Sequence, residues 1–376
     1  MKNLLILLLT LVCVMFWSCD SDDSPVQKPE DEIKIDWGAA ADNSSNALIN
    51  SFWNAGGKYF NRNSNGDAGF EYWPQAHALD VLIDAYIRTG DNLYKRHFDL
   101  WFEGVRIKNG NTWKNEYYDD MEWIALAILR AYKATNDEKY KNAALEIWEY
   151  IKEGWNNNAG GGITWKKGME YSKNACSNGP ACILAARLYQ EFGDEANKEW
   201  ALKIYGWEKS TLFNSNNGMV YDNINSQTGE IKKDWVFTYN QGTFIGSAVE
   251  LHKILGEKAY LRDAVLAADY TISSLVSNSI LKSEGTGDGG LFKGIFVRYF
   301  TDLIQQDRLD NADKKRYVQF LKYNAETLWN TGTTKSSFFF GPDWRNAPGS
   351  TTGLTEQLSG SMLIEAAALL QDKEIL

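Results

Sequence analysis

Residues 131–140 read AYKATNDEKY, a pattern that predicts the end of one helix, a tight turn and the start of the next helix. Asparagine and glycine readily adopt the left-handed conformation that ends a helix, and acidic residues favour the N-terminus of the helix that follows. Similar patterns recur in segments 85–94, 188–195 and 251–260. The chain therefore predicts a repeat of helical hairpins.

The spacing of apolar residues predicts twelve helices, at about 44–61, 76–89, 91–107, 119–135, 137–153, 175–192, 194–213, 240–256, 258–277, 290–305, 310–330 and 354–371. Every second helix is rich in alanine and apolar on most sides, which is typical of buried helices. Six inner and six outer helices describe an all-α fold, the (α/α)6 barrel of six helical hairpins. Long loops precede the inner helices, so we expect the functional site where the inner helices begin.

The first residues have the features of an export signal. A short basic start at 1–3 is followed by an apolar run at 4–17, which is too short to span a bilayer comfortably. Residues 16–19 read FWSC and resemble the cleavage box of bacterial lipoproteins, although the two aromatic residues are bulkier than usual. We expect a lipoprotein signal peptide at 1–18 and a lipid anchor on Cys19 that holds the protein to the membrane.

An acidic, proline-containing tether is expected at 19–36. Its residues 20–23 read DSDD, which favours either export to the cell surface or an ordinary solvated linker. The expected location is therefore the outer membrane, on its surface-exposed or periplasmic face. No second linker interrupts residues 37–376, which we interpret as a single catalytic domain.

The composition limits the classes of partner. The 376 residues include 39 Lys and Arg and 49 Asp and Glu, with a formal net charge of −10, so nucleic acid is not an expected partner. No metal-ligand spacing or phosphate loop stands out, and we expect no cofactor, no metal and a monomer. Six helical residues would separate Cys176 from Cys182 by roughly 9 Å along the axis, so both are expected to be reduced.

Two adjacent aspartates, Asp119 and Asp120, begin a strongly apolar helix in the run YYDDMEWIALA at 117–127. Hydrolysis of a sugar bond usually needs two carboxyl groups, one at the sugar carbon and one that protonates the leaving oxygen. Aspartates at a helix start also cap free N–H groups and match the helix dipole. On this spacing alone, capping and catalysis both remain open.

Polar and aromatic clusters precede all six inner helices. They read FEYWPQAH (70–77), YYDD (117–120), GGGITW (160–165) with KNACSNGP (173–180), WVFTYNQG (235–242), GGLFKG (289–294), and DWR (343–345) with GLTE (353–356). Helix capping explains each cluster taken alone. Six clusters that converge on one rim favour a functional site.

Four motifs stand in order along the chain: YDDMEW (118–123), GGITW (161–165), NACSNGP (174–180) and YNQG (239–242). Together they resemble glycoside hydrolase family 76, the endo-α-1,6-mannanases, and their fungal wall transglycosidase relatives. The resemblance extends from about residue 37 to the C-terminus, and the aspartate pair is its most specific element. It implies retention of the anomeric configuration, with Asp119 as the nucleophile and Asp120 as the acid/base.

The geometry of a helix constrains this pair. Neighbouring helical residues point about 100° apart, so both reach one ligand only at a helix end. A helix N-terminus lowers the pKa of a carboxyl group, which suits a nucleophile. Burial against Tyr118 or Trp123 and repulsion within the pair must raise the pKa of the acid. We therefore expect Asp120 to titrate at a higher pH than Asp119.

Further candidates for substrate binding are Tyr118, Trp73, Trp165, Asn174, Asn178, Tyr239, Asn240 and Gln241, together with Trp344. The aromatic rings could stack on mannose, with core packing as the alternative, and the amides could donate and accept hydrogen bonds to hydroxyls. Pro180 close behind Asn178 also fits a helix cap. We interpret His77 and His252 as core or surface histidines, and Asp67, Asp222 and Asp288 as turn residues.

The resemblance implies an enzyme that hydrolyses α-1,6-mannosidic bonds within mannan. The expected partner is an α-mannan polysaccharide or oligosaccharide. Two alternatives remain open. A transglycosidase would use the same site but resolve the intermediate with a sugar, and a surface glycan-binding protein would use the same scaffold without turnover.

Overall fold

The computed structural model describes residues 34–376, so the expected signal peptide, Cys19 and nearly all of the expected tether lie outside the described residues. The described part contains twelve α-helices. The inner helices are α2 (Tyr72–Thr89), α4 (Tyr118–Thr135), α6 (Gly179–Phe192), α8 (Thr238–Leu255), α10 (Asp288–Ile304) and α12 (Leu354–Asp372). The outer helices are α1 (Trp37–Phe52), α3 (Asn92–Lys108), α5 (Glu138–Lys152), α7 (Glu195–Thr211), α9 (Lys258–Ser274) and α11 (Asn311–Asn330).

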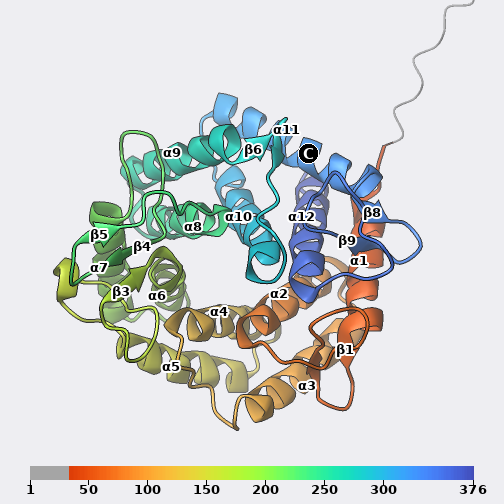
Figure 1. Cartoon of the computed structure of the whole chain (residues 1–376), viewed down its shortest axis with the longest axis horizontal. Coiled ribbons are helices and arrows are strands. Elements are labelled where there is room, and N and C mark those ends of the chain that lie inside the picture. The colour runs from red at the N-terminus through yellow and green to blue at the C-terminus, as the bar shows by residue number, and fades with distance from the viewer. Residues whose placement is uncertain (1–33) are drawn as a thin grey trace, which may run out of the picture. The chain divides into compact units, whose positions relative to one another are not determined.

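The helices form two concentric rings (Figure 1). Each inner helix packs against the next, and α12 packs back against α2, which closes the inner ring. Helix α12 is buried on nearly all sides, whereas α3 buries one stripe that includes Phe98 and Trp101. This difference is expected between helices inside a barrel and helices that cover it. The predicted (α/α)6 barrel is confirmed.

The predicted hairpin turns have the expected geometry. Gly90, Asn136, Gly193 and Gly256 adopt the left-handed conformation at the ends of α2, α4, α6 and α8. After the first three, the next residue is an aspartate whose side chain accepts a hydrogen bond from the backbone N–H two residues further on. These local signals join an inner helix to the following outer helix with a short turn.

Helix α1 differs from the prediction, which placed it at 44–61. It begins at Trp37 because the Asp36 side chain caps its first turn with a hydrogen bond of 3.0 Å. It ends at Phe52, after which the chain forms the antiparallel pair β1 (Trp53–Asn54) and β2 (Tyr59–Phe60). The aromatic residues of this pair continue the apolar pattern of the helix, which explains the error.

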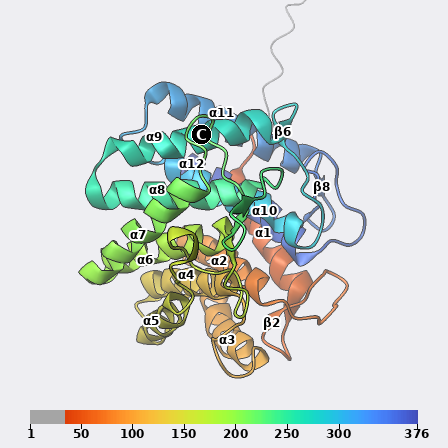
Figure 2. The same ribbon diagram turned by 60° about the vertical axis from the view of Figure 1, so that its left-hand side comes forward.

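The long loops before the inner helices contain short strands that the helical spacing does not predict. Besides β1 and β2 they are β3 (Ser172–Asn174), β4 (Asn223–Asn225), β5 (Glu230–Ile231), β6 (Val276–Ser277), β7 (Ile280–Leu281), β8 (Thr333–Thr334) and β9 (Phe339–Phe340). The strands β3, β4 and β5 form one antiparallel sheet, and the others pair in hairpins. Figure 2 shows β2, β6 and β8 on the same side of the barrel. These loops shape the end where the inner helices begin, which we call the open end.

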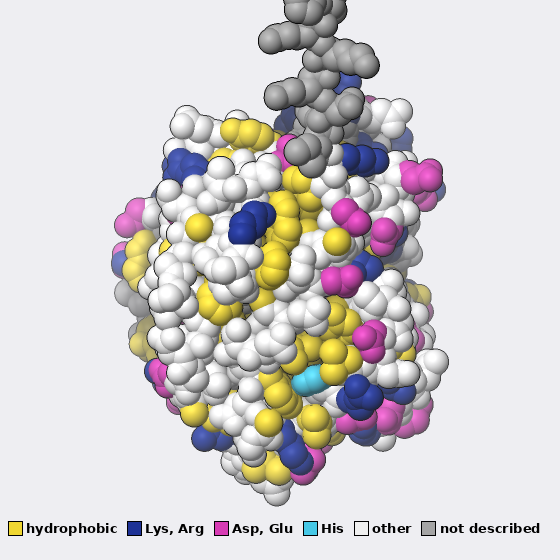
Figure 3. All heavy atoms as spheres, turned by 90° about the vertical axis from the view of Figure 1, so that its right-hand side faces the viewer, with side chains coloured by type: hydrophobic (Ala, Val, Ile, Leu, Met, Phe, Trp, Pro, Cys, Tyr) yellow, Lys and Arg dark blue, Asp and Glu magenta, His cyan; other side chains and the backbone are white. Residues whose placement is uncertain are grey.

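The surface carries both acidic and basic side chains, as the composition of the chain leads one to expect. On the face in Figure 3, acidic and basic side chains are interspersed. Within residues 34–376, every helix is too short or too polar to cross a membrane. Cys176 and Cys182 are both buried and free, as predicted.

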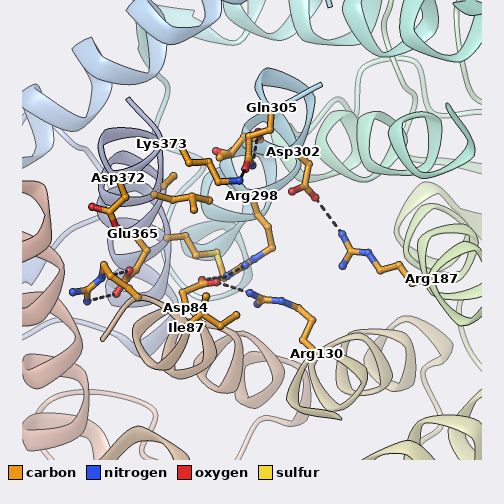
Figure 4. A pocket seen from close by; sticks show the side chains of 15 residues that line it. Asp84, Ile87, Arg130, Arg187, Arg298, Asp302, Gln305, Glu365, Asp372 and Lys373 are labelled. Carbon is orange, nitrogen blue, oxygen red and sulfur yellow. Dashed lines mark hydrogen bonds and ion pairs between the residues drawn. The ribbon is translucent and has the colours of Figure 1, made fainter. Parts of the chain in front are cut away.

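Buried ion pairs hold the opposite end, which we call the closed end (Figure 4). Arg130 pairs with Asp80 and Asp84, and Arg298 shares Asp84 at 2.8 Å. Further pairs join Arg88 to Asp42 and Glu365, and Arg187 to Glu250 and Asp302. They surround a hollow of about 380 Å³. Because each of these guanidinium groups faces a carboxylate, the network links the ends of the inner helices.

Helix α1 begins at this closed end. The Trp37 backbone N–H donates a hydrogen bond to Gln371 Oε1, near the end of α12, at 3.0 Å. Arg88, at the end of α2, donates to Asp42 in α1 at 2.7 Å. The described chain therefore both enters and leaves the barrel at the closed end.

Candidate active site

A cleft of about 810 Å³ lies at the open end, and ligand pockets typically measure about 300–1,000 Å³. Its acidic lining residues are Glu71, Asp119, Asp120, Asp222 and Asp288, and its aromatic lining residues are Tyr72, Trp73, Tyr117, Trp123, Trp165, Trp235, Phe237, Tyr239 and Phe292. No Lys or Arg of the described chain lines it. Aromatic faces and unpaired carboxylates suit a neutral, hydroxyl-rich ligand, and they disfavour an anionic polymer.

Asp119 and Asp120 lie in the first turn of α4. The N-cap residue of α4 is Tyr117, whose side chain makes no capping bond, so neither aspartate is the N-cap. The Tyr118 backbone N–H donates to the Trp165 carbonyl at 2.9 Å, which joins the start of α4 to the loop that carries Trp165. The pair is therefore placed at a helix end, with both side chains on the cleft.

Asp119 interacts with a thiol. The Cys176 Sγ–H donates to Asp119 Oδ2 at 3.4 Å. Burial raises the pKa of Asp119 to about 7, and the Cys176 thiol, backbone N–H groups of the pair and the Trp165 side chain partly oppose this rise. These donors stabilise the charged carboxylate.

Asp120 has a different environment. Burial raises the pKa of Asp120 well above its usual range, and the negative charges of Asp119, Asp288 and Glu116 raise it further. Because donors favour the anion at Asp119 and negative charges oppose it at Asp120, a proton shared by the pair resides on Asp120. This agrees with the order expected from the sequence.

Four of the predicted substrate residues, Trp73, Trp165, Asn174 and Tyr239, line the cleft. The Trp73 indole N–H donates to Asp288 Oδ1 at 3.0 Å, a bridge from α2 to α10. The Tyr239 ring stacks on Phe292 with 3.9 Å between centroids. These contacts hold the rings in fixed orientations around the aspartate pair.

The other four, Tyr118, Asn178, Asn240 and Gln241, are buried behind the cleft wall. Asn178 bonds to the backbone of Ile163, Asn240 to the Asp222 carboxylate, and Gln241 to the backbone of Val220. These amides bond to groups inside the protein and do not line the cleft, so they support its wall.

Trp344 does not reach the cleft either. It is fully buried, and the Lys293 ammonium lies 4.1 Å from its ring centroid. The expectation that Trp344 stacks on a sugar is wrong, since its ring packs in the core.

The cleft residues that the sequence reasoning missed include Cys176, Asp222, Asp288 and Trp235. The interpretation of Asp222 and Asp288 as simple turn residues is wrong. Asp222 Oδ1 accepts hydrogen bonds from Asn240 at 2.9 Å and from the Tyr239 hydroxyl at 3.4 Å. The position of Cys176 within the motif at 174–180 was the one signal that could have identified it.

The remaining titratable candidates keep structural roles. His77 lies between the rings of Trp73 and Trp123, with centroids 5.5 and 4.9 Å away, and burial lowers its pKa to about 3, so it is neutral. Asp67 accepts a hydrogen bond from the Gly69 backbone in a turn. Within residues 34–376, no three His, Cys, Asp or Glu side chains are grouped so that they could bind a metal.

Comparison with known proteins gives consistent matches. The α-1,6-mannanase GH76A of Salegentibacter sp. HEL1_6 is 47% identical, with a TM-score of 0.87 over 89% of this chain and 100% of that chain. Its inactive variant in complex with α-1,6-mannotriose matches with 46% identity, a TM-score of 0.86 and the same coverage. Mannan endo-1,6-alpha-mannosidase DCW1 of Saccharomyces cerevisiae is 27% identical over 161 residues. The matched stretch covers 39% of this chain and 36% of that relative.

The model of glycosyl hydrolase family 76 matches residues 36–376, which include the whole barrel. The chain therefore belongs to glycosyl hydrolase family 76.

Proposed function

We propose that this protein is a retaining endo-α-1,6-mannanase that cleaves the backbone of α-mannan. The observation that carries the proposal is the adjacent pair Asp119 and Asp120 in an aromatic cleft, with donors around the first and negative charges around the second. The inactive Salegentibacter variant, in which two consecutive aspartates are replaced by asparagine, supports it because that protein binds α-1,6-mannotriose.

In the first step, the Asp119 carboxylate attacks the anomeric carbon of the mannose. The glycosidic bond breaks, and Asp120 gives its proton to the leaving oxygen. The products are a free chain with a new hydroxyl and a mannosyl ester on Asp119. Burial, together with the charges of Asp119 and Asp288, raises the pKa of Asp120 and keeps it protonated before this step.

In the second step, Asp120 is a carboxylate and removes a proton from water. The resulting hydroxide attacks the anomeric carbon, the ester bond to Asp119 breaks, and Asp120 is protonated again. Two displacements at the same carbon restore its configuration. A sugar hydroxyl in place of water would give transglycosylation, so the acceptor decides between the two reactions.

The test is product release from debranched α-1,6-mannan by the parent, Asp119→Asn and Asp120→Asn. We expect short oligosaccharides from the parent and at least about 10³-fold slower release from either variant, because each loses a carboxyl group that the reaction needs. Asp137→Asn, at the half-buried N-cap of α5 and outside the cleft, is the matched control and should keep full activity. NMR of the first products should show the α-anomer.

Other outcomes would identify the alternatives. β-Anomeric first products would contradict a nucleophilic Asp119. Products longer than the substrate when short mannosides are added in excess would indicate a transglycosidase. Tight mannan binding by a parent that releases nothing would indicate a glycan-binding protein.

We further propose that the mature protein is an outer-membrane lipoprotein attached through Cys19, because FWSC follows an apolar run at 4–17. Mass spectrometry of the mature N-terminal peptide should find a diacylglyceryl group on Cys19. The Cys19→Ala variant should no longer be recovered in the membrane fraction. An unmodified Cys19 in the mature protein would disprove the anchor.

A further inference from the structure

A second hollow, of about 430 Å³, lies on the same rim as the cleft. Both hollows share Glu71 as a lining residue. Gly287 lines the second hollow and its neighbour Asp288 lines the cleft. The two hollows are therefore adjacent at the starts of α2 and α10, and the second one extends towards the start of α12.

The Trp73–Asp288 hydrogen bond of 3.0 Å lies at the border between the two hollows. Both partners line the cleft. Glu71, two residues before Trp73, and Gly287, directly before Asp288, line the second hollow. A linear polymer that leaves the cleft over this bridge enters the second hollow. The two spaces can therefore belong to one continuous groove across the barrel end.

The walls of the second hollow are held by bonds between segments far apart in the chain. The Leu354 backbone N–H donates to the Arg62 carbonyl at 2.8 Å, and the Ser64 N–H donates to the Thr352 carbonyl at 3.0 Å. The Thr352 N–H in turn donates to Ser64 Oγ at 3.0 Å. These bonds fix the loop before α2 against the loop before α12, so the hollow is preformed.

The Arg62 guanidinium is held on three sides. Its Nε lies 2.9 Å from Glu71 Oε1 and its Nη1 lies 3.7 Å from Asp67 Oδ2. It also packs against Gly69, where an added Cβ would come within 2.6 Å of the guanidinium carbon. A fixed guanidinium beside a carboxylate offers donors and acceptors to neighbouring hydroxyls of one sugar ring.

The rest of the lining combines polar side chains with Pro342 and Pro348, and it includes the carboxylate of Glu356. It includes the amides Asn63 and Asn65 and the hydroxyl of Thr351. Glu356, only 3% exposed, accepts a hydrogen bond from the Thr355 hydroxyl at 2.9 Å. One arginine against two glutamates disfavours an anionic ligand, and amides and hydroxyls suit a neutral sugar.

We propose that this second hollow is a distal sugar-binding site, which holds mannose residues of the same backbone beyond the Trp73–Asp288 bridge. This inference rests on the proposed function. It makes the protein selective for long chains, because a short oligosaccharide occupies the cleft and leaves the distal site empty.

The test uses the double variant Asn65→Leu/Thr351→Leu. Both positions are exposed and line only the second hollow. The change therefore removes polar groups and narrows the hollow without touching the cleft. We expect kcat/KM for α-1,6-mannohexaose to fall about tenfold or more, which is about 1.4 kcal/mol. The value for α-1,6-mannotriose should change less than twofold.

Asn216→Leu, an exposed asparagine outside both hollows, is the matched control and should leave both substrates unaffected. Equal losses for both substrates, or no loss for mannohexaose, would overturn the distal site. If the double variant melts at a lower temperature than the parent, the single Asn65→Ala and Thr351→Ala variants decide the question by the same comparison.

Calorimetry separates this inference from the proposed function. Mannohexaose should bind Asp119→Asn/Asp120→Asn more tightly than it binds the same protein with the two leucine changes. If the parent cleaves neither substrate but this difference in affinity remains, the proposed function fails and the distal site stands. Equal affinities in the two proteins would overturn the distal site, whatever the parent cleaves.

Discussion

The Cys176 thiol contacts the Asp119 carboxylate at 3.4 Å, and it is the first of the donors that hold down the pKa of that group. A thiol is a weak hydrogen-bond donor. It therefore stabilises the anion without removing much of its basicity. A nucleophile benefits from this balance, since a strongly solvated carboxylate attacks more slowly.

Cys176→Ala removes this donor, and we expect the pKa of Asp119 to rise above its present value of about 7. A carboxylate nucleophile is active only when charged, so the acidic limb of the kcat/KM profile should move to higher pH. The measurement is a pH–rate profile on α-1,6-mannotetraose. Cys176→Ser keeps a donor and should move the limb less. An unchanged limb in Cys176→Ala would show that the contact does not tune Asp119.

At the scale of single residues, the local pattern predicted two aspartates at a helix start, and only the resemblance to family 76 implied their catalytic roles. The sequence did not predict which amides face the cleft. Asn178 and Gln241 bond to backbone groups 15 and 21 residues away. Such partners depend on the packing of loops, which no local spacing reveals.

Among the elements, the loop at 156–162 is held by one buried side chain. Lys173, in β3, donates to the carbonyl oxygens of Asn156 at 2.9 Å, Gly162 at 3.0 Å and Gly161. The same loop continues into Trp165, which lines the cleft. One ammonium group therefore positions a catalytic wall through backbone contacts.

Lys173→Met keeps the length of the side chain but leaves these carbonyl groups without a donor. We expect the free energy of unfolding to fall by at least about 1–3 kcal/mol, the cost of an unmet buried polar group. KM should rise more than kcat falls, because Trp165 binds substrate and does not react. Urea unfolding and steady-state kinetics measure both effects.

Lys173→Arg restores a donor and should recover part of the stability and of KM. Unchanged KM in Lys173→Met, despite lower stability, would show that the lysine holds the fold without positioning Trp165.

The helices themselves were predictable because each inner helix is apolar on most sides and the hairpin turns have characteristic residues. Boundaries were less predictable. Helix α6 begins at Gly179 and not at 175, because a 3₁₀ turn at Ala175–Ser177 precedes it. This turn brings Cys176 to the cleft, so the boundary error and the missed thiol have the same cause.

On the scale of the whole molecule, catalysis and stability are placed at opposite ends of the barrel. Within residues 34–376, Asp119, Asp120, Asp222 and Asp288 at the cleft have no cationic partner, whereas the carboxylates of the closed end are paired with arginines. The cost of unpaired carboxylates at the cleft is offset by packing and ion pairs elsewhere in the barrel.

Arg298→Met should therefore lower stability without slowing the reaction. Removing one partner of a largely buried ion pair costs about 3 kcal/mol, and the Arg298 side chain is 14% exposed. We expect a lower melting temperature and unchanged kcat/KM on α-1,6-mannan. Lys322→Met breaks the exposed pair with Glu326 and is the control, with a change within about 0.5 kcal/mol. A loss of activity in folded Arg298→Met would show coupling between the two ends.

The path of the chain has a practical consequence. Trp37 and Gln371 touch at the closed end, so an attachment made before α1 or after α12 is remote from the groove. A bead, a fusion partner or an electrode surface joined to either end should leave the groove free for a polymer of any length. The barrel is therefore suited to immobilisation, with substrate flowing past it and products carried away.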